Sequence, residues 1–559
     1  MNHPRVSIPD RPQSIHAGWN FADVWEAVAA ADPDKVAHRH GADSITWRAF
    51  DQTANGLAAW LLRAGCAHQD KVALYLYNGF EYLQATFACL KVSLVPVNTN
   101  YRYRQQELHA LWDNADASVV IFDGAFTAFV EEIRSRCTKV RHWIRVDDGQ
   151  PCPAWAVPYA EAAAPSEQPA RGAVVRSGDD LIVIYTGGTT GQPRGVMWRQ
   201  HDLYVASNTT GDPEAADMAI VTARLAQPGF HRPTGLPAAP LMHGTAFVFA
   251  ATVLHRGGTV VTLTARQLDI DELLDAVQDC RVTELCIVGD AFCRPIVDAL
   301  DAAPARWHLG SLKAVSSSGM MWGESNKERL LRHAPQAVLV DFLNSSEASG
   351  MGRAISSRGR GNAPARFKLG RNALVLGADN QPLPPGSSEI GRVAVRGGVP
   401  LGYYGDPVKT AVTFPVVDGV RYAIPGDFAR LEADGSITLL GRGSVSINSG
   451  GEKVFPEEVE ECVKELPAVR DAVVVGVPHE RFGESVTALV ESVAGAGLTR
   501  AAVIDHVRGR LASHKVPRHV VFVESLQRGP NGKADYVRLR QLAAEAVRSA
   551  AGTAVAQGV

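Results

Sequence analysis

The stretch Ile184-Tyr185-Thr186-Gly187-Gly188-Thr189-Thr190-Gly191-Gln192-Pro193-Arg194-Gly195-Val196-Met197 is the part of the sequence on which the rest depends. It follows a short apolar run, residues 181–184, that predicts a buried strand. Glycines let backbone N–H groups approach a ligand, threonine hydroxyls add donors, and Arg194 adds a positive guanidinium. The loop chemistry therefore predicts a polyphosphate ligand.

A glycine-rich surface turn is the alternative explanation, and it holds for most stretches of this kind. Two features count against it here: hydroxyls and a cation are crowded into one loop, and Pro193 stiffens the end of that loop. The stretch differs from a nucleotide P-loop because no Gly-Lys-Ser/Thr follows at the required spacing. It also differs from the Gly-x-Gly-x-x-Gly turn of dinucleotide-binding proteins.

The stretch closely resembles the phosphate loop of the adenylate-forming enzymes, whose pattern is Thr-Ser-Gly-Thr-Thr-Gly-x-Pro-Lys-Gly. Gly187 stands in the serine place and Arg194 in the lysine place. This family includes acyl-CoA synthetases, aryl-CoA ligases, luciferases and the adenylation domains of peptide synthetases. The resemblance implies that the loop binds ATP, with Thr189 taking part in catalysis, through Thr186, Gly187, Gly188, Thr189, Thr190, Gly191 and Arg194.

Length and composition limit the classes of protein that the chain can belong to. At 559 residues it is too long for one ordinary core, so at least two domains are expected. The net charge of -3 shows no excess of basic residues of the kind that nucleic-acid binding requires. The eight cysteines include no Cys-x-x-Cys pair, which favours reduced thiols in the cytoplasm over disulfides or a zinc site.

No stretch of the sequence predicts a secretory signal or a membrane span. Residues 1–19 contain prolines and charges but no apolar core. The most apolar region, residues 246–263, is interrupted by His255-Arg256-Gly257-Gly258. The sequence leaves a peripheral association with membrane lipid as an alternative.

Strand and helix patterns alternate over residues 21–178 and again over residues 203–340. This alternation predicts parallel sheets covered by helices. From residue 371 the strands become shorter, and Asp434-Gly435 predicts a hairpin. We therefore expect an α/β fold, in which a large N-terminal domain combines parallel-rich sheets and helices with a β-rich subdomain.

The pattern changes again after Gly441-Arg442-Gly443-Ser444. A helix opened by Pro456-Glu457-Glu458 is followed by further strands and a helix, which together predict a small α+β domain. The Ala/Gly-rich end, residues 546–559, predicts a frayed tail.

The resemblance to the adenylate-forming family covers nearly the whole chain. It is greatest to bacterial fatty-acyl and steroid-side-chain CoA ligases, in phrases such as Gly-Val-Met-Trp-Arg (195–199), Gly-Asp-Ala-Phe-Cys-Arg-Pro (289–295) and Ile-Asn-Ser-Gly-Gly-Glu-Lys-Val (447–454). It implies an N-terminal adenylation domain over 1–441, a hinge over 442–444 with Ser444 at its pivot, a mobile C-terminal lid over 445–545, and a flexible tail over 546–559.

The segment from Asp341 to Glu347 resembles the family's aromatic-Gly-x-Thr-Glu motif. Ser346 takes the threonine place, and Glu347 takes the place of the glutamate that holds Mg²⁺ on the triphosphate, a role suited to a carboxylate. Leu343 stands where the family has an aromatic residue against adenine, and Asn344 stands for glycine. Asparagine tolerates left-handed backbone angles, so we expect the turn to survive.

Further nucleotide contacts are implied by the same resemblance. Asp427, after Pro425-Gly426, takes the place of the acid that accepts hydrogen bonds from both ribose hydroxyls, and Arg442 that of the second ribose contact. Ser318 and Gly319 match the adenine-side loop, and Asp341 also belongs to the ATP site. Taken without the resemblance, these residues predict only polar turns.

Lys533, in Pro530-Asn531-Gly532-Lys533, matches the family's adenylation lysine, which reaches from the lid to the α-phosphate and the carboxylate. A lysine in a polar tail is otherwise nearly always a solvated charge. His243 matches a residue of the acyl pocket, although a satisfied core histidine is an equal alternative. The segment that contacts CoA in the family corresponds to Ser449, Gly450, Gly451 and Lys453.

These motifs together predict an ATP-dependent acyl-CoA ligase that uses Mg²⁺ and coenzyme A. The expected acid is a medium- or long-chain fatty acid or a steroid side-chain acid, and the resemblance also allows a homodimer. Two alternatives remain: an adenylating enzyme that passes the acyl group to a carrier protein or an amine, and a degenerate ATP-binding relative without activity. Leu343, Asn344 and Arg194 suggest the second alternative, and retention of Glu347 and Lys533 argues against it.

Overall fold

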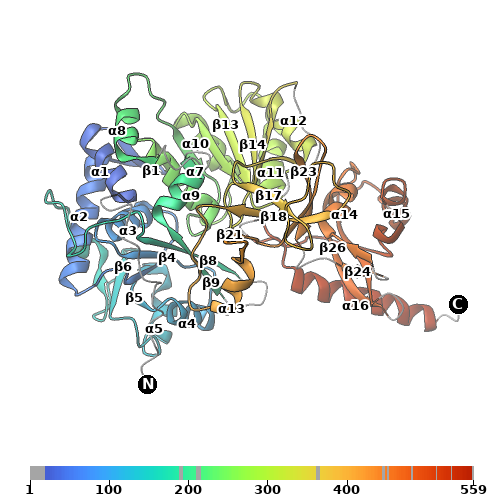
Figure 1. Ribbon diagram of the computed structural model, residues 1–559, viewed down its shortest axis with the longest axis horizontal. Helices are drawn as coiled ribbons and strands as arrows, with labels where there is room; N and C mark the ends of the chain where they lie inside the picture. The colour runs from blue at the N-terminus through green and yellow to red at the C-terminus, as the bar shows by residue number, and fades with distance from the viewer. Residues whose placement is uncertain are drawn as a thin grey trace.

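The computed structural model describes residues 19–187, 193–208, 216–320, 322–359, 365–442, 447–449, 452–479, 483–511, 513–529 and 532–556. Within these residues, no helix has the length and apolar character needed to cross a membrane. The chain runs from the N-terminal sheets at one end of the long axis to a separate C-terminal unit at the other (Figure 1).

The first N-terminal sheet carries the glycine-rich loop. Its strands in the described residues are, in spatial order, β19 (Gly402–Tyr403), β9 (Pro193–Arg199), β8 (Leu181–Gly187), β4 (Val95–Asn98), β3 (Lys71–Tyr75), β5 (Ala117–Asp123), β6 (His142–Val146) and β7 (Val157–Pro158). Neighbours from β8 to β7 are parallel, whereas β9 pairs antiparallel with both β8 and β19. The glycine-rich loop therefore joins two strands of a hairpin, since Gly187 lies opposite Pro193.

The second sheet changes from parallel to antiparallel along its width. Its strands in the described residues are β2 (Asp43–Thr46), β1 (Val36–His40), β11 (Thr259–Thr262), β10 (Thr234–Pro237), β12 (Glu284–Ile287), β13 (Ala314–Ser318), β14 (Val338–Leu343), β15 (Gly352–Ser356), β16 (Arg366–Leu369), β23 (Ser436–Arg442), β22 (Asp427–Leu431), β18 (Ile390–Arg396), β21 (Val420–Ala423) and β20 (Val416–Val417), with β17 (Ala373–Leu376) also on β18. Pairs from β1 to β14 are parallel, and those from β14 onward are antiparallel.

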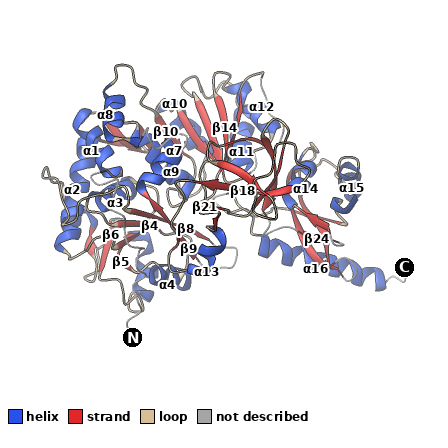
Figure 2. Cartoon of the chain, in the orientation of Figure 1, coloured by secondary structure: helices blue, strands red, loops and turns tan. Residues whose placement is uncertain are grey.

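Helices flank both N-terminal sheets (Figure 2). Those described are α1 (Phe21–Ala31), α2 (Trp47–Arg63), α3 (Phe80–Lys91), α4 (Gln105–Asn114), α5 (Thr127–Ile133), α6 (Tyr159–Ala162), α7 (Gln200–Asn208), α8 (Met218–Ala226), α9 (Gly244–His255), α10 (Ile270–Asp279), α11 (Gly289–Ala302), α12 (Glu324–His333) and α13 (Pro407–Thr413). Helix α9 begins where β10 ends and returns to β11, the crossover that two parallel strands require. Its apolar face packs with β8 in one core cluster, so α9 lies between the two sheets (Figure 1).

The C-terminal unit is a small α+β domain at the right of Figure 1. Its sheet comprises, in the described residues, β25 (Glu452–Val454), β24 (Ile447–Ser449), β27 (Gly483–Ser492), β26 (Val469–His479) and β28 (His519–Val523). Helices α14 (Pro456–Lys464), α15 (Arg500–Arg508) and α16 (Tyr536–Ala556) pack against it.

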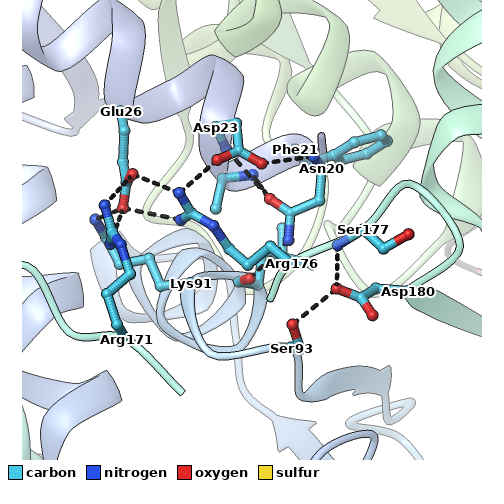
Figure 3. Close-up of polar contacts among 12 residues, drawn as sticks. Asn20, Phe21, Asp23, Glu26, Lys91, Ser93, Arg171, Arg176, Ser177 and Asp180 are labelled. Carbon is cyan, nitrogen blue, oxygen red and sulfur yellow. Dashed lines mark hydrogen bonds and ion pairs between the residues drawn. The ribbon is translucent and has the colours of Figure 1, made fainter. Parts of the chain in front are cut away.

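A network of charges around the buried Lys91 fastens the connection before β8 to helices α1 and α3 (Figure 3). Glu26 of α1 accepts hydrogen bonds from Lys91 of α3 at 2.8 Å and from Arg171 and Arg176 at 2.7–3.0 Å. Burial opposes ionisation of Glu26, but Arg176 and Lys91 outweigh it and hold the pKa of Glu26 at about 2. Because the Lys91 side chain is fully buried, this network is part of the core.

The α/β fold expected from the sequence is confirmed, including the parallel-rich sheets, the β-rich subdomain and the small C-terminal domain. The hairpin expected at Asp434-Gly435 is also confirmed, since β22 and β23 pair antiparallel with Leu431 opposite Ile437. Helix α16 continues to Ala556, into the Ala/Gly-rich segment 546–559 for which the sequence predicts a frayed tail. Alanine has the highest helix propensity, which explains a helix in this Ala-rich segment.

Candidate active site

One cavity of about 2070 Å³ opens between the two N-terminal sheets and the C-terminal domain. It gathers residues that the sequence had placed in separate motifs. Those that line it are Thr186, Arg194, His243, Ser318, Gly319, Asp341, Ser346, Glu347, Asp427 and Lys533. Motifs spread over nearly 350 residues of sequence therefore meet at a single site.

Asn98 at the end of β4 fixes the strand that leads into the glycine-rich loop. Its Nδ2 donates to the carbonyls of Tyr185 at 2.9 Å and Met242 at 2.7 Å, and its Oδ1 accepts from the Tyr185 N–H at 2.7 Å. This amide thereby joins β4, β8 and the turn that precedes His243. The result is a fixed distance between the start of the loop and the start of α9.

Strand β9 and the neighbouring β19 hold the segment from Ser346 to Glu347. The indole Nε1 of Trp198 donates to the Ser346 carbonyl at 2.8 Å, and the Tyr403 hydroxyl donates to Glu347 Oε1 at 2.9 Å. The Arg194 guanidinium lies 5.9 Å from the centre of the Tyr403 ring. Burial, followed by the Glu347 charge, raises the pKa of Tyr403 to about 12, so its hydroxyl remains a donor.

The turn after Leu343 is held by a side chain rather than by an unusual backbone angle at Asn344. Asn344 Oδ1 accepts from the Gly350 N–H at 2.7 Å, and Ser345 Oγ accepts from the Ala348 N–H at 3.1 Å. The left-handed residue here is Gly350, with φ +75°. The turn is therefore present with asparagine in the glycine place, and the Asn344 amide caps it without left-handed backbone angles at Asn344.

Asp341 lies at the base of the cavity, near the end of β14. Its carboxylate is 3.7 Å from Lys327 Nζ, and both side chains are buried. Burial raises the pKa of Asp341 to about 7, and the attraction of Lys327 only partly offsets this. An acid in this position takes up or releases a proton near neutral pH.

The adjacent strand and the antiparallel part of the sheet supply the remaining walls. Gly319, with φ +94°, follows β13, and its conformation places the Ser318–Gly319 backbone along the cavity. Asp427 opens β22 and is directly opposite Arg442 of β23 in the register. The two expected ribose contacts are thus cross-strand neighbours.

The C-terminal domain presents Lys533 to the cavity. Gly532, with φ +71°, packs so closely on the N-terminal domain that an added Cβ would lie 2.7 Å from Ala291 Cβ and 2.8 Å from Met320 Sδ. His243, the residue before α9, faces the same space: burial, followed by the charges of Lys533 and Arg102, lowers its pKa to about 4. Its Nε2 is buried and has no hydrogen-bond partner among the described residues.

Some expected site residues are not at the cavity or fall outside the description. Ser449 is buried in β24, away from the cavity lining. Gly188, Thr189, Thr190, Gly191, Ser444, Gly450 and Gly451 lie outside the described residues, as do the side chains of Arg442 and Lys453. The Gly187 backbone ends β8, where it leads into the loop.

Comparison with known proteins places the chain in a family. The family of AMP-binding enzymes matches residues 25–404, more than half of the chain, and its C-terminal domain matches residues 458–533. The chain belongs to the AMP-binding enzyme family.

Two bacterial ligases are among the known proteins that are similar to this chain in sequence. A medium/long-chain-fatty-acid and 3-oxocholest-4-en-26-oate CoA ligase of Mycolicibacterium smegmatis is 38% identical over 92% of this chain and 95% of the relative. A medium-chain acyl-CoA ligase of Mycobacterium avium is 40% identical over 93% of this chain and 97% of the relative. Among solved structures, an anthranilate CoA ligase with anthranoyl-AMP superposes with a TM-score of 0.80 at 19% identity, covering 96% of this chain and 99% of that one.

The sequence reasoning missed residues that hold the candidate site together. Tyr403 and Asn98 belong to no motif that signals them, since each acts through a contact with a distant strand. Trp198 was part of a recognised phrase, Gly-Val-Met-Trp-Arg, but nothing in that phrase indicates that its indole bonds to Ser346. The sequence offered one indication of the role of Trp198. Because side chains alternate between the two faces of a strand, Arg194 and Trp198, four residues apart in β9, lie on the same face.

Proposed function

We propose that this protein is an AMP-forming acyl-CoA ligase. In the first half-reaction a carboxylate oxygen attacks the α-phosphorus of ATP, the bond to the β-phosphate bridging oxygen breaks, and pyrophosphate leaves. In the second, the thiol sulfur of coenzyme A attacks the acyl carbon, the bond to the AMP oxygen breaks, the thiol proton goes to solvent, and AMP leaves. The observation that carries the proposal is the single cavity shared by Glu347, Asp427 and Lys533.

The residues at the cavity suit the first half-reaction. Lys533 brings a positive charge on a flexible stem to developing negative charge at the α-phosphate. Asp427 offers a two-oxygen acceptor for ribose hydroxyls. Neutral His243, with its unsatisfied Nε2, positions the substrate carboxylate, which needs no base because it is already ionised at neutral pH.

The donor set beside the glycine-rich loop fits Mg²⁺. Glu347 is a carboxylate, Ser346 offers a hydroxyl, and both are oxygen ligands of the kind that Mg²⁺ prefers. Glu347 would hold the ion, which neutralises charge on the triphosphate. Tyr403 orients that carboxylate by its hydrogen bond.

The substrate that we propose is a medium- or long-chain fatty acid or a steroid side-chain acid. The support comes from the two bacterial relatives, 38% and 40% identical to this chain: one is named as a ligase of medium/long-chain fatty acids and of 3-oxocholest-4-en-26-oate, and the other as a medium-chain acyl-CoA ligase. Ser449, Gly450, Gly451 and Lys453 are the residues that we propose for coenzyme A. All eight cysteines are unpaired thiols, which supports a reducing compartment, the cytoplasm.

Two assays test the proposed function. Pyrophosphate release over a panel of acids, each with ATP and Mg²⁺, measures the first half-reaction, and AMP release that requires free coenzyme A measures the second. We expect both with fatty or steroid acids. Pyrophosphate release without coenzyme A-dependent AMP release would favour the alternative of transfer to a carrier protein or an amine, and no pyrophosphate with any acid would contradict an adenylating enzyme.

A further inference from the structure

One arm of the cavity runs away from the nucleotide residues along helix α9. Its lining residues on this helix are Thr245, Val248, Phe249 and Thr252, followed by Arg256 just after the helix. They recur every three or four positions and so form one stripe. The other face of α9 is buried in the core.

The opposite wall of this arm comes from alternate residues of β12 and β13. Glu284 pairs with Ala314 and Cys286 with Ser316 in the parallel register, and all four line the cavity. Ser318 lies at the nucleotide end, four residues beyond Ala314. At about 3.3 Å per residue, the arm therefore extends about 13 Å from Ser318 to the level of Glu284.

An ion pair stands at the far end of the arm. Arg256 Nη1 lies 2.8 Å and 2.9 Å from the two carboxylate oxygens of Glu284. His231 Nε2 is 3.8 Å from the same carboxylate, and burial, followed by the charges of Lys313 and Arg256, lowers the pKa of His231, which favours its neutral form. The walls of the arm are mixed apolar and hydroxyl-bearing, but its end is charged.

The chemistry of this end favours an oxygen over a methyl group. A guanidinium has five N–H donors, and in the described part of the chain the side-chain contacts of Arg256 all pass through Nη1. Because Arg256 lines the cavity, we infer that its Nη2 and Nε donors are available to a ligand there. An alkyl end would remove water from the ion pair without replacing its hydrogen bonds, and Glu284 would repel a second carboxylate.

We propose that the Arg256–Glu284 pair selects acids that carry a neutral oxygen acceptor, a ketone or a hydroxyl, at the end opposite to the reacting carboxylate. This inference rests on the proposed function, because it assumes that the acid occupies this arm. It makes Arg256 a specificity-determining residue. Glu284 sets the preference for a neutral oxygen.

The test compares acids of equal length in pairs, one with a terminal alkyl end and one with a ketone at the penultimate carbon, over a series of chain lengths. We expect kcat/KM for pyrophosphate release to favour the keto acid about tenfold or more at the length that reaches Arg256, the factor that one hydrogen bond to a charged group contributes. Affinities of the same acids are measured by titration calorimetry.

Variants assign the preference to the ion pair. Arg256→Met retains the apolar stem and loses the donors, so the keto-to-alkyl ratio should fall to about one. Glu284→Gln leaves the guanidinium without its counter-charge, so acids with a second, distal carboxylate should improve relative to the alkyl acids. Arg306→Met, at an exposed arginine paired with Asp271, is the matched control and should keep the wild-type ratio.

Equal kcat/KM for keto and alkyl acids at every length, or a keto preference that survives Arg256→Met, would overturn the inference. The two failures are distinguishable. If no acid releases pyrophosphate but calorimetry still shows an Arg256-dependent keto preference, the proposed function fails and the selective site stands.

Discussion

At the scale of single residues, Glu347 depends on a partner 56 positions away, because the Tyr403 hydroxyl binds its carboxylate. Ser346 beside it is held through its carbonyl by Trp198. Asn98 likewise holds β8, the strand that leads into the glycine-rich loop: its amide nitrogen donates to the Tyr185 carbonyl and its amide oxygen accepts from the Tyr185 N–H. The reactive motifs are therefore positioned by residues that carry no chemistry of their own.

Lys533 is expected to serve the first half-reaction alone. Lys533→Ala should lower acyl-adenylate formation about a hundredfold or more, the size of effect seen when one charge-stabilising donor is removed. Thioester formation from supplied acyl-adenylate should continue, since that step needs no charge at the leaving pyrophosphate. Each half-reaction is measured separately by pyrophosphate release and by consumption of the free thiol.

The control for this variant is Lys515→Ala, on the same domain, where the lysine pairs with Glu458 and does not line the cavity. It should spare both half-reactions. Equal loss of both in Lys533→Ala would refute a role restricted to adenylation.

Asp341 should make stability depend on pH. Its pKa is raised to about 7 in the folded protein, above its ordinary value of 3.8, so the folded state holds an extra proton between these values. Stability from this group is therefore present at low pH and declines as the pH rises toward 7. Asp341→Asn removes this titration. The free energy of unfolding of the variant minus that of the wild type should therefore rise from pH 5 to pH 7 and stay constant above pH 7. Denaturant melts across this range measure it, and parallel profiles would contradict the assignment.

At the scale of elements, the hairpin β8–β9 and helix α9 define the site between them. The hairpin supplies Thr186 and Arg194, while α9 begins directly after His243 and lines the distal arm. The charge network of α1 and α3 holds the segment that leads into β8. Replacing Lys91 of this network tests how far the stability of the N-terminal domain depends on it.

Lys91→Met should destabilise the N-terminal domain by about 1–3 kcal/mol, because it removes a buried cation from the partly buried carboxylates of Glu26 and Asp51. Lys91 Nζ lies 2.8 Å from Glu26 and 2.6 Å from Asp51, with no exposure of the lysine side chain. Lys35→Met is the matched control: Lys35 also pairs with an aspartate, Asp32, but its side chain is 57% exposed. We expect a change of about 0.5 kcal/mol or less there. Similar denaturation midpoints for the two variants would contradict a structural role for the network around Lys91.

At the scale of the whole molecule, the C-terminal domain contributes one wall of the cavity. In this structure Lys533 lines the cavity, whereas Ser449 of the proposed coenzyme A segment is buried in its own sheet. We infer that thioester formation requires the domain to rotate about the hinge that we place at residues 442–444.

Gly532→Ala should slow adenylation by hindering this docked position. The added Cβ would overlap Ala291 and Met320, and the left-handed backbone costs a further ~1–2 kcal/mol, so about a tenfold loss of pyrophosphate release is expected. Gly495→Ala is a close control, because Gly495 has φ +75° on the same domain and nothing within 4 Å of the added Cβ. If both variants retain the same rate, contact at Gly532 does not matter for adenylation.

The sequence by itself determined the layout and the reactive groups. Alternating strand and helix patterns predicted the α/β architecture, because hydrophobic periodicity is a local property of the chain. The glycine-rich loop predicted a polyphosphate ligand, and the resemblance of this loop, Glu347, Asp427 and Lys533 to the motifs of the adenylate-forming family predicted an ATP site. Local reasoning did not reveal that the Asn344 side chain caps its turn by accepting from the Gly350 N–H, or that α16 extends to Ala556.

Tertiary structure alone decided how these groups meet. The support of Glu347 by Tyr403, the docking of Gly532 on Ala291 and Met320, and the Arg256–Glu284 pair at the end of the cavity all join residues far apart in sequence. Each depends on strand register and on the packing of one domain against another. No local pattern of residues encodes such a contact, since its free energy arises only when distant surfaces come together.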